Sequence, residues 1–316
     1  MKDEADLRDA DRAVRVGACT LHRSALWRRI SAGTRTSLAS VTAIAGTAIA
    51  WAAGYDGVLL VSHDGGMKWN RVCSGTERHL RSVCFVDEFR GHVGGWHVML
   101  HTRDGGRTWC STTLPSAVEA VRFVSPRLGV AVGRDGLILR TVDGGNEWRR
   151  VRSGTRRALR SLWLHGEREA TVVGDQGTLL WSVDAGRTWA LRRLGSADLR
   201  AVYFIDRQRG WLAGAGGTVA YTENGGRSWQ RTEQAPTRHL LSTLVFADAR
   251  TGWALGSGLG NAYAPVWRTE DGGRTWEREF SGTVDPINAA TLVAGRVCAV
   301  GRFGTVLLRD LEVFLS

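Results

Sequence analysis

The stretch Thr102-Arg-Asp104-Gly-Gly-Arg-Thr-Trp109 recurs with small changes six times in this chain of 316 residues. Successive copies place their tryptophans 40, 39, 41, 40 and 47 residues apart. The aspartate (asparagine in the fifth copy) and tryptophan of the six copies are Asp64 and Trp69, Asp104 and Trp109, Asp143 and Trp148, Asp184 and Trp189, Asn224 and Trp229, and Asp271 and Trp276. Such a period indicates a repeat architecture.

The residues between two copies form four short apolar runs. After Trp148-Arg-Arg-Val151 come Leu159–Leu164, Ala170–Gly174 and Thr178–Ser182, with glycine or polar turns between them. Short apolar runs bounded by such turns are typical of strands joined by hairpins. Four strands in about forty residues predict one blade of a β-propeller. No long run has a 3.6-residue apolar period, so we expect few helices.

The two ends of the chain predict the number of blades. Trp27-Arg-Arg-Ile30 matches Trp148-Arg-Arg-Val151, and Trp27 precedes Trp69 by 42 residues. Residues 287–308 supply three more strands. We therefore predict an all-β, seven-bladed propeller of four-stranded antiparallel blades over residues 27–316, with the N-terminal strand completing the last blade beside Thr305–Arg309. This closure removes the free sheet edge. Residues 1–26 form an N-terminal extension, for which flexibility is one interpretation.

The repeated turn is interpreted as structural. Glycine allows positive φ, aspartate accepts hydrogen bonds from N–H groups of its own turn, and tryptophan fills the space between blades. A single aspartate per turn supplies too few oxygens for calcium. Five cysteines without a CxxC pair do not suggest zinc or a disulfide framework. We expect no metal and no cofactor, and we interpret the eight histidines as surface or turn residues.

The repeat resembles the Asp-box, or bacterial neuraminidase repeat, over residues 27–310. Within that superfamily, the Gly-Trp-x-x-Gly segments Gly210–Gly214 and Gly252–Gly256 make the chain most similar to the photosystem II assembly and stability factor family. This resemblance implies a non-enzymatic propeller that binds a protein client through an arginine patch. One departure is that the start of this chain has no recognisable export or transit signal.

Arginine dominates the charge of the protein. The net charge is +11, and only Lys2 and Lys68 are lysines, so 42 − 2 leaves 40 arginines. We predict an arginine-rich face that binds an acidic protein segment or a membrane-protein client, because arginine suits bidentate capture of carboxylates. Its residues are Arg78, Arg156 and Arg157, with Arg35 and Arg238, in blade-to-blade loops; Arg81, Arg160 and Arg200 at the channel mouth; and Arg134 and Arg302 in inter-strand turns. The alternative is local pairing with Glu77, Asp135 and Asp198.

Two other classes of function stay open as alternatives. A sialidase-like glycoside hydrolase or a glycan-binding protein shares the repeat, but no proline follows Arg-Ile and no tyrosine has an evident carboxylate partner. We therefore predict that the protein is not an enzyme. A nucleic-acid-binding propeller would use the positive charge, yet no basic motif interleaved with aromatic residues is present.

The location of the protein is predicted from its cysteines and its first residues. Unpaired cysteines and the polar start favour a cytoplasmic protein, with a periplasmic or membrane-associated location as the alternative. The apolar stretch Ser37–Gly54 is short for a membrane span and is interpreted as two strands of the first blade.

Overall fold

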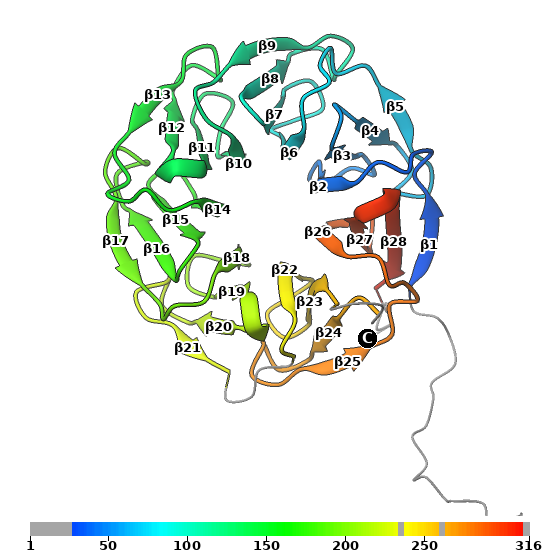
Figure 1. Cartoon of the computed structure of the whole chain (residues 1–316), viewed down its shortest axis with the longest axis vertical. Helices are drawn as coiled ribbons and strands as arrows, with labels where there is room; N and C mark the ends of the chain where they lie inside the picture. Colours follow the sequence, from blue (N-terminus) through cyan, green and yellow to red (C-terminus); the bar gives the residue numbers. More distant parts are fainter. Residues whose placement is uncertain (1–26, 233–236, 259–262, 312–316) are drawn as a thin grey trace, which may run out of the picture.

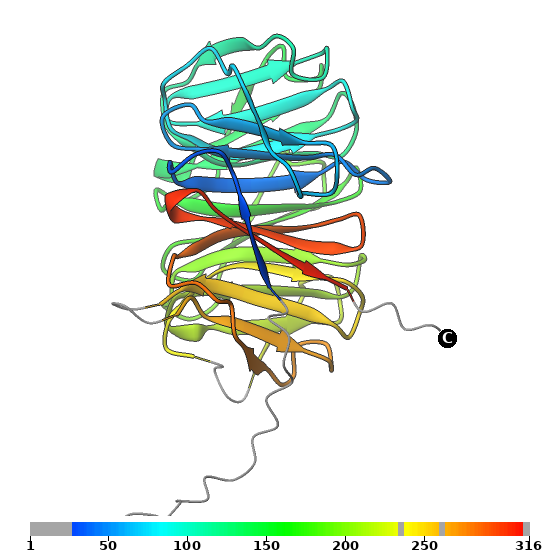
Figure 2. The same cartoon turned by 90° about the vertical axis from the view of Figure 1, so that its right-hand side faces the viewer.

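The computed structural model describes residues 27–232, 237–258 and 263–311. Seven four-stranded antiparallel sheets surround a central channel, and in six of them the four strands follow one another in sequence from the channel outwards (Figure 1). Figure 2 shows the ring from its edge. This is the predicted seven-bladed, all-β propeller, so the fold class is confirmed.

The strands of the blades have the following bounds. Blade 1 holds β2 (Leu38–Ala43), β3 (Ala50–Gly54), β4 (Leu59–Ser62) and β5 (Asn70–Val72), and blade 2 holds β6 (Leu80–Phe85), β7 (Gly91–Gly95), β8 (Val98–Thr102) and β9 (Cys110–Thr113). Blade 3 holds β10 (Val118–Phe123), β11 (Gly129–Gly133), β12 (Ile138–Thr141) and β13 (Arg149–Val151), and blade 4 holds β14 (Leu159–His165), β15 (Glu169–Gly174), β16 (Thr178–Ser182) and β17 (Ala190–Arg193). Blade 5 holds β18 (Leu199–Phe204), β19 (Gly210–Gly214), β20 (Val219–Thr222) and β21 (Gln230–Arg231), and blade 6 holds β22 (Leu240–Phe246), β23 (Gly252–Ser257), β24 (Val266–Thr269) and β25 (Glu277–Glu279). Blade 7 holds β26 (Ile287–Val293), β27 (Arg296–Gly301), β28 (Thr305–Asp310) and, as its outermost strand, β1 (Arg28–Ser31).

Three short 3-10 turns join the second and third strands of blades 3, 5 and 7. They are η1 (Arg134–Gly136), η2 (Ala215–Gly217) and η3 (Arg302–Gly304). No helix of the described residues is long and apolar enough to cross a membrane. The apolar stretch 37–54 contains β2 and β3, as predicted.

The two chain ends share blade 7. Strand β1 runs antiparallel to β28, with Arg28 opposite Leu308 and Ser31 opposite Thr305. Figure 2 shows this dark blue strand beside the red strands of the C-terminal end. Trp27, just before β1, is only 3% exposed and packs in a cluster with Trp253 and Leu307. The predicted closure is confirmed, and β28 therefore has a neighbour on each side.

The repeated turns form a hydrogen-bond unit that includes a hydroxyl that the sequence interpretation did not use. In blade 2, the Thr102 hydroxyl donates to Asp104 Oδ1 at 2.8 Å and accepts from the Gly106 N–H at 2.9 Å. Asp104 Oδ1 also accepts from the Thr108 N–H at 2.9 Å. The same serine or threonine stands two positions before the aspartate or asparagine in each copy, as Ser62, Thr102, Thr141, Ser182, Thr222 and Thr269.

Acid should weaken these turns. The hydroxyl and N–H of Thr108 and the hydroxyl of Thr102 lower the pKa of Asp104 to about 2, and the pKa of Asp64, Asp143, Asp184 and Asp271 is lowered as well. A carboxylate whose folded pKa is depressed contributes stability above its unfolded pKa, and this contribution disappears as pH falls through the folded value. We expect the melting temperature to drop between about pH 4 and pH 2.

A variant with asparagine at the five aspartates tests the origin of this acid sensitivity. Asn224 Oδ1 already accepts from the Ser228 N–H at 3.0 Å in the fifth copy, so an uncharged side chain can serve the turn. The variant should fold, and its melting temperature should change much less over that pH range. An unchanged acid profile would show that other carboxylates cause the transition.

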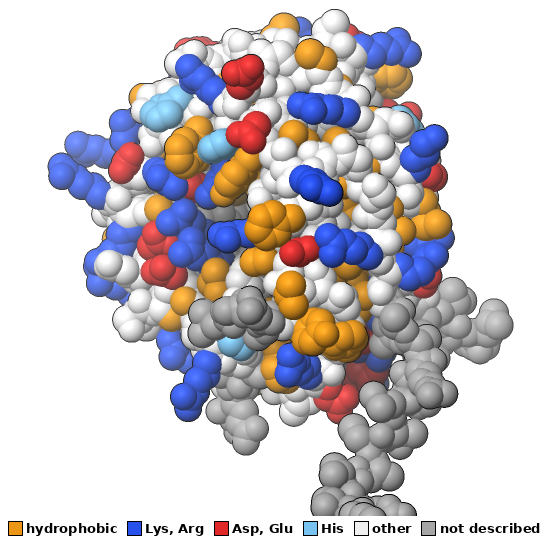
Figure 3. Space-filling view, turned by 45° about the vertical axis from the view of Figure 1, so that its right-hand side comes forward, with side chains coloured by type: hydrophobic (Ala, Val, Ile, Leu, Met, Phe, Trp, Pro, Cys, Tyr) orange, Lys and Arg blue, Asp and Glu red, His pale blue; other side chains and the backbone are white. Residues whose placement is uncertain are grey.

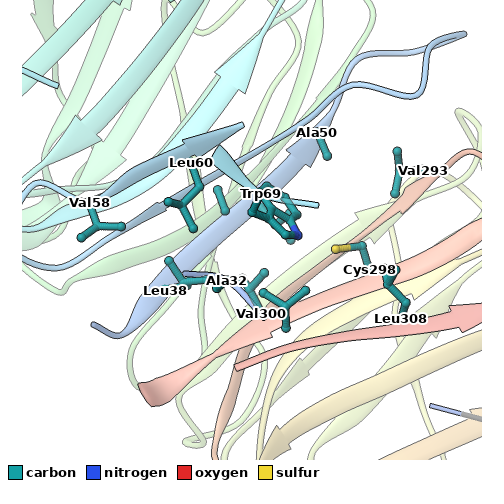
Figure 4. Close-up of a cluster of buried hydrophobic side chains, with 13 residues drawn as sticks. Ala32, Leu38, Ala50, Val58, Leu60, Trp69, Val293, Cys298, Val300 and Leu308 are labelled. Carbon is teal, nitrogen blue, oxygen red and sulfur yellow. The ribbon is translucent and has the colours of Figure 1, made fainter. Parts of the chain in front are cut away.

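Buried apolar side chains gather between the blades rather than within them. Each of seven clusters combines side chains of two neighbouring blades. Figure 4 shows one, in which Trp69 of blade 1 lies near Val293, Cys298 and Leu308 of blade 7. Complete burial raises the pKa of the Cys298 thiol to about 12, so this cysteine is a packing residue.

Stacked aromatic rings recur at several of these interfaces. Trp211 of β19 stacks on Phe246 of β22 with ring centroids 3.6 Å apart, and Trp276 meets the same phenylalanine edge-on. Trp51, Phe85 and Trp109 repeat this arrangement between blades 1 and 2. At the interface of blades 2 and 3 the first ring is a histidine, because His92 stacks on Phe123 at 3.8 Å.

The histidine interpretation was wrong at two positions. His92 is 3% exposed and His165 is 6% exposed. Both lie in strands, β7 and β14, and their side chains are buried against a neighbouring blade. Burial lowers the pKa of both, to about 3 for His92 and about 4 for His165, so they are neutral at pH 7.

Residues 1–26 lie outside the described residues, and so does the middle of the loop at residues 256–265 that lengthens blade 6.

Candidate functional site

One residue of every innermost strand is left unpaired and lines the channel mouth. The pairing of the first two strands of each blade skips a residue at the same position, which is a β-bulge. The seven bulge residues are Ala39, Arg81, Glu119, Arg160, Arg200, Ser242 and Asn288, and all of them line a channel volume of about 800 Å³. The bulge therefore sets a seven-membered ring of side chains at one end of the channel.

The charged members of this ring form a chain of ion pairs across blades 2 to 5. Glu119 is 7% exposed and contacts Arg81 at 3.1 Å, Arg160 at 3.3 Å and Arg134 at 3.2 Å. Asp175 contacts Arg160 at 2.7 Å. Hydrogen bonds with Asp175 raise the pKa of Arg160, and Arg160 lowers that of Asp175 against the effect of burial.

Arg200 continues the chain in blade 5. It lies 3.2 Å from Asp198 and 3.8 Å from Asp175. Four arginines thus face three carboxylates, and most of the positive charge at the channel mouth is compensated locally. Blades 1, 6 and 7 add only Ala39, Ser242 and Asn288 to the ring. Figure 3 shows blue and red side chains side by side along the left of the hollow near the centre of that view.

A second group of arginines lies in loops at the same end of the blades and has no carboxylate partner in the part of the chain that the structure describes. Arg78 and Arg156 lie in blade-to-blade loops, Arg302 lies in η3, and all three are exposed. Among the described residues no ion pair is formed by these three, by the exposed Arg35 and Arg238, or by the half-buried Arg157. We call Arg35, Arg78, Arg156, Arg157, Arg238 and Arg302 the rim arginines.

Aromatic side chains flank the ring at blades 1 and 2. Tyr55 stacks on His79 with centroids 4.5 Å apart, and His79 meets Trp96 edge-on at 5.2 Å. Trp96 is 40% exposed, and the Arg134 guanidinium lies 5.1 Å from the centroid of its ring. Arg81 donates to the Tyr55 hydroxyl at 2.9 Å. This edge of the face therefore presents apolar area next to guanidinium groups.

The structure divides the arginines named from sequence into two sets. The first set lies together at the channel mouth and forms ion pairs with carboxylates; it consists of Arg81, Arg134, Arg160 and Arg200. Of the acids that we predicted as partners, Asp198 forms such an ion pair. The other named acids behave differently, since Asp135 accepts from Ser116 at 3.0 Å and Glu77 lines a pocket with Arg78. Glu119 and Asp175 were missed as partners. Glu119 follows Val118 in blade 3, at the position where Arg81, Arg160 and Arg200 follow a leucine in their blades. An alignment of the repeats at this position would have shown that Glu119 belongs to the same ring.

Comparison with known proteins gives one relative in sequence and several in fold. No protein-family model matches the chain. Over 131 residues it is 30% identical to the photosystem II assembly protein Ycf48 of Synechococcus sp. (strain JA-2-3B'a(2-13)), a match that spans 39% of each chain. The chain is a seven-bladed propeller similar to Ycf48. The aligned segment covers about two fifths of the length of that relative.

Solved structures extend the likeness to the whole ring. YCF48 from Cyanidioschyzon merolae matches with a TM-score of 0.74 and 21% identity over 90% of this chain and 98% of the other. A structure described as YCF48 bound to D1 peptide matches with a TM-score of 0.74 and 21% identity, over 92% and 97% of the two chains. A GH74 xyloglucanase from Xanthomonas campestris matches with a TM-score of 0.73 and 14% identity over 92% of this chain and 54% of the other. At these identities the structures establish the shared fold.

Proposed function

We propose that this propeller is a non-enzymatic scaffold that binds an acidic segment of a protein partner, in the manner of an assembly factor, on the face that carries the rim arginines. The observation that carries this proposal is that these arginines have no carboxylate partners among the described residues, whereas the neighbouring channel-mouth arginines do. A guanidinium without a carboxylate partner offers its remaining donors to a carboxylate from outside, and this includes Arg78, which donates one hydrogen bond to the His97 carbonyl. A membrane-protein client is one such partner, and binding of a peptide is supported by a similar propeller that was solved with D1 peptide bound.

The channel mouth supports a binding role rather than a hydrolytic one. Retaining and inverting glycosidases need two carboxyl groups set across a cleft, one of them able to hold a proton. Here Glu119, Asp175 and Asp198 are each held in an ion pair with an arginine, and Arg160 lowers the pKa of Asp175 against the effect of burial. Free cysteines Cys73, Cys84, Cys110 and Cys298 support a cytoplasmic location as part of the same proposal.

Charge reversal of the rim arginines tests the proposal. We expect Arg78→Glu, Arg156→Glu and Arg302→Glu together to weaken binding of a fluorescent polyglutamate peptide, and of the D1 peptide, by roughly tenfold or more. Fluorescence anisotropy at low and high salt measures this, and binding to the original protein should weaken with salt.

A matched variant separates this effect from net charge. Arg71→Glu, Arg150→Glu and Arg278→Glu change the charge equally on exposed outer strands and should leave the affinity nearly unchanged. Equal loss in both triple variants would overturn the assignment of the face. Tight binding of single-stranded DNA that depends on the rim arginines would favour the nucleic-acid alternative.

A further inference from the structure

A pocket of about 510 Å³ opens between blades 2 and 3 on the face of the repeated turns, opposite the rim arginines. A related pocket of about 320 Å³ lies between blades 5 and 6. Their linings correspond position by position. The first is lined by Arg90, His92, His101, Thr102, Arg103, Pro126, Arg127, Asp143 and Gly144, with Phe89 in addition, and the second by Arg209, Trp211, Tyr221, Thr222, Glu223, Ala249, Arg250, Asp271 and Gly272, with Arg274 in addition.

The first difference between the two pockets is the ring that closes them. In the smaller pocket, the Trp211 indole N–H donates to the Gly272 carbonyl at 2.7 Å. His92 takes the same place in the larger pocket, is 97% buried, and has no hydrogen-bond partner for Nδ1 among the described residues. The smaller imidazole accounts for added volume and leaves a buried polar atom that a ligand could satisfy.

The second difference is charge. In the smaller pocket Glu223 pairs with Arg274 at 2.9 Å, and the Arg274 guanidinium also lies 5.8 Å from the ring centroid of Tyr221. In the larger pocket Arg103 stands at the position of Glu223, and His101 stands at the position of Tyr221. Arg103 donates to the amide oxygen of Asn146, which stands at the position of Arg274. The larger pocket therefore has a guanidinium where the smaller pocket has a carboxylate. The hydrogen-bond partner of that group is a neutral amide in the larger pocket and an arginine in the smaller one.

The remaining charges of the larger pocket leave a positive excess. Arg127 donates to the Val142 carbonyl, and neither it nor Arg103 forms an ion pair among the described residues. Arg90 pairs with Asp87 at 2.8 Å. The lining carboxylate, Asp143, accepts hydrogen bonds from Thr141 and the Glu147 N–H within its own turn.

The two histidines respond to this positive environment. Burial first, then His101 and Arg103, lower the pKa of His92, and burial and Arg103 lower that of His101. Both imidazoles are neutral at pH 7, and each then carries one N–H donor. A group of three histidine, cysteine, aspartate or glutamate residues able to hold a metal ion is absent from the described part of the chain, so the lining suits an anion better than a cation.

We propose that the pocket between blades 2 and 3 binds a small oxyanion of the phosphate or carboxylate class, held by Arg103 and Arg127 with the N–H groups of His92 and His101. The volume lies in the range of small-ligand sites. This site is separate from the proposed protein-binding face, so failure of either proposal leaves the other standing.

The blade 5–6 pocket supplies the design of the test. His92→Trp with Arg103→Glu introduces the tryptophan and the carboxylate of the smaller pocket, and the tryptophan has room because Gly145, like Gly273 beside Trp211, lacks a side chain. Isothermal titration with inorganic phosphate, and separately with acetate and succinate, distinguishes the two oxyanion sources. We expect the original protein to bind at least one of them, with binding reduced at least tenfold in the variant.

Further readouts keep the result interpretable. Phosphate or carboxylate should shift the imidazole NMR signals of His92 and His101 in the original protein. Arg103→Glu alone, which leaves the stacked ring in place, should also lose binding, whereas Arg150→Glu on an outer strand should not. Absence of binding and of signal shifts in the original protein, or equal binding by the double variant, would overturn the proposal.

Discussion

Replacing Glu279 by glutamine is expected to lower the free energy of unfolding by about 3–5 kcal/mol. Glu279 is the buried carboxylate at the closure of the ring, with 9% of its side chain exposed. It accepts hydrogen bonds from Trp27 Nε1 at 2.9 Å, from Trp253 Nε1 at 3.1 Å, and from Nε and Nη2 of Arg309 at 3.2 Å and 3.0 Å. Arg309 is 1% exposed, so loss of the carboxylate leaves a buried guanidinium without its counter-charge.

Denaturant unfolding followed by tryptophan fluorescence measures this loss. Glu277→Gln, two residues earlier on the same strand and exposed, is the control and should change stability by less than about 0.5 kcal/mol. Adding Arg309→Met to Glu279→Gln should recover part of the loss, because a buried ion pair can be replaced by apolar groups at little cost. A loss below about 1 kcal/mol for Glu279→Gln would contradict the role given to this cluster.

Truncation of Trp27 to alanine is expected to cost about 3–5 kcal/mol. The indole is 3% exposed and packs with Trp253 and Leu307, residues more than two hundred positions away in the chain. Its loss leaves a cavity where β1 joins blade 7 and also removes one donor from Glu279. The melting temperature and the protection of blade 7 amides from hydrogen exchange should both fall.

Ser31→Ala is the matched control for this second prediction. Ser31 lies in β1, is exposed, and its side chain accepts one long hydrogen bond, from the Gly33 N–H at 3.4 Å, among the described residues. It should change stability by less than about 0.5 kcal/mol. If Trp27→Ala were equally mild, β1 would contribute little to closure, and the ring would depend on β26, β27 and β28 alone.

Because Trp27 and Glu279 are in contact, their effects should not add. The double variant Trp27→Ala, Glu279→Gln is expected to lose less than the sum of the single losses, since Glu279→Gln weakens the same charge-assisted hydrogen bond that Trp27→Ala removes. This coupling would locate the closure energy in one shared cluster.

Sequence alone determined the fold of this protein. A turn unit recurring at a nearly constant interval leaves only short strands between its copies, and the match between Trp27 and Trp148 predicts that both ends share one blade. These features are local or periodic. Alternating short strands and glycine turns restrict the backbone without reference to distant residues, so they can be recognised in the linear chain.

Only the tertiary structure decided which arginines stay free to bind a partner. Arg81 and Arg156 are both arginines near the start of an inner strand, yet Arg81 meets Glu119 from the next blade, and Arg156 has no such partner among the described residues. The same holds for His92, whose neighbours Phe123 and Gly145 belong to another blade. Pairing between blades depends on the position of side chains about forty residues apart around a closed ring, and a repeat pattern contains no distances between them.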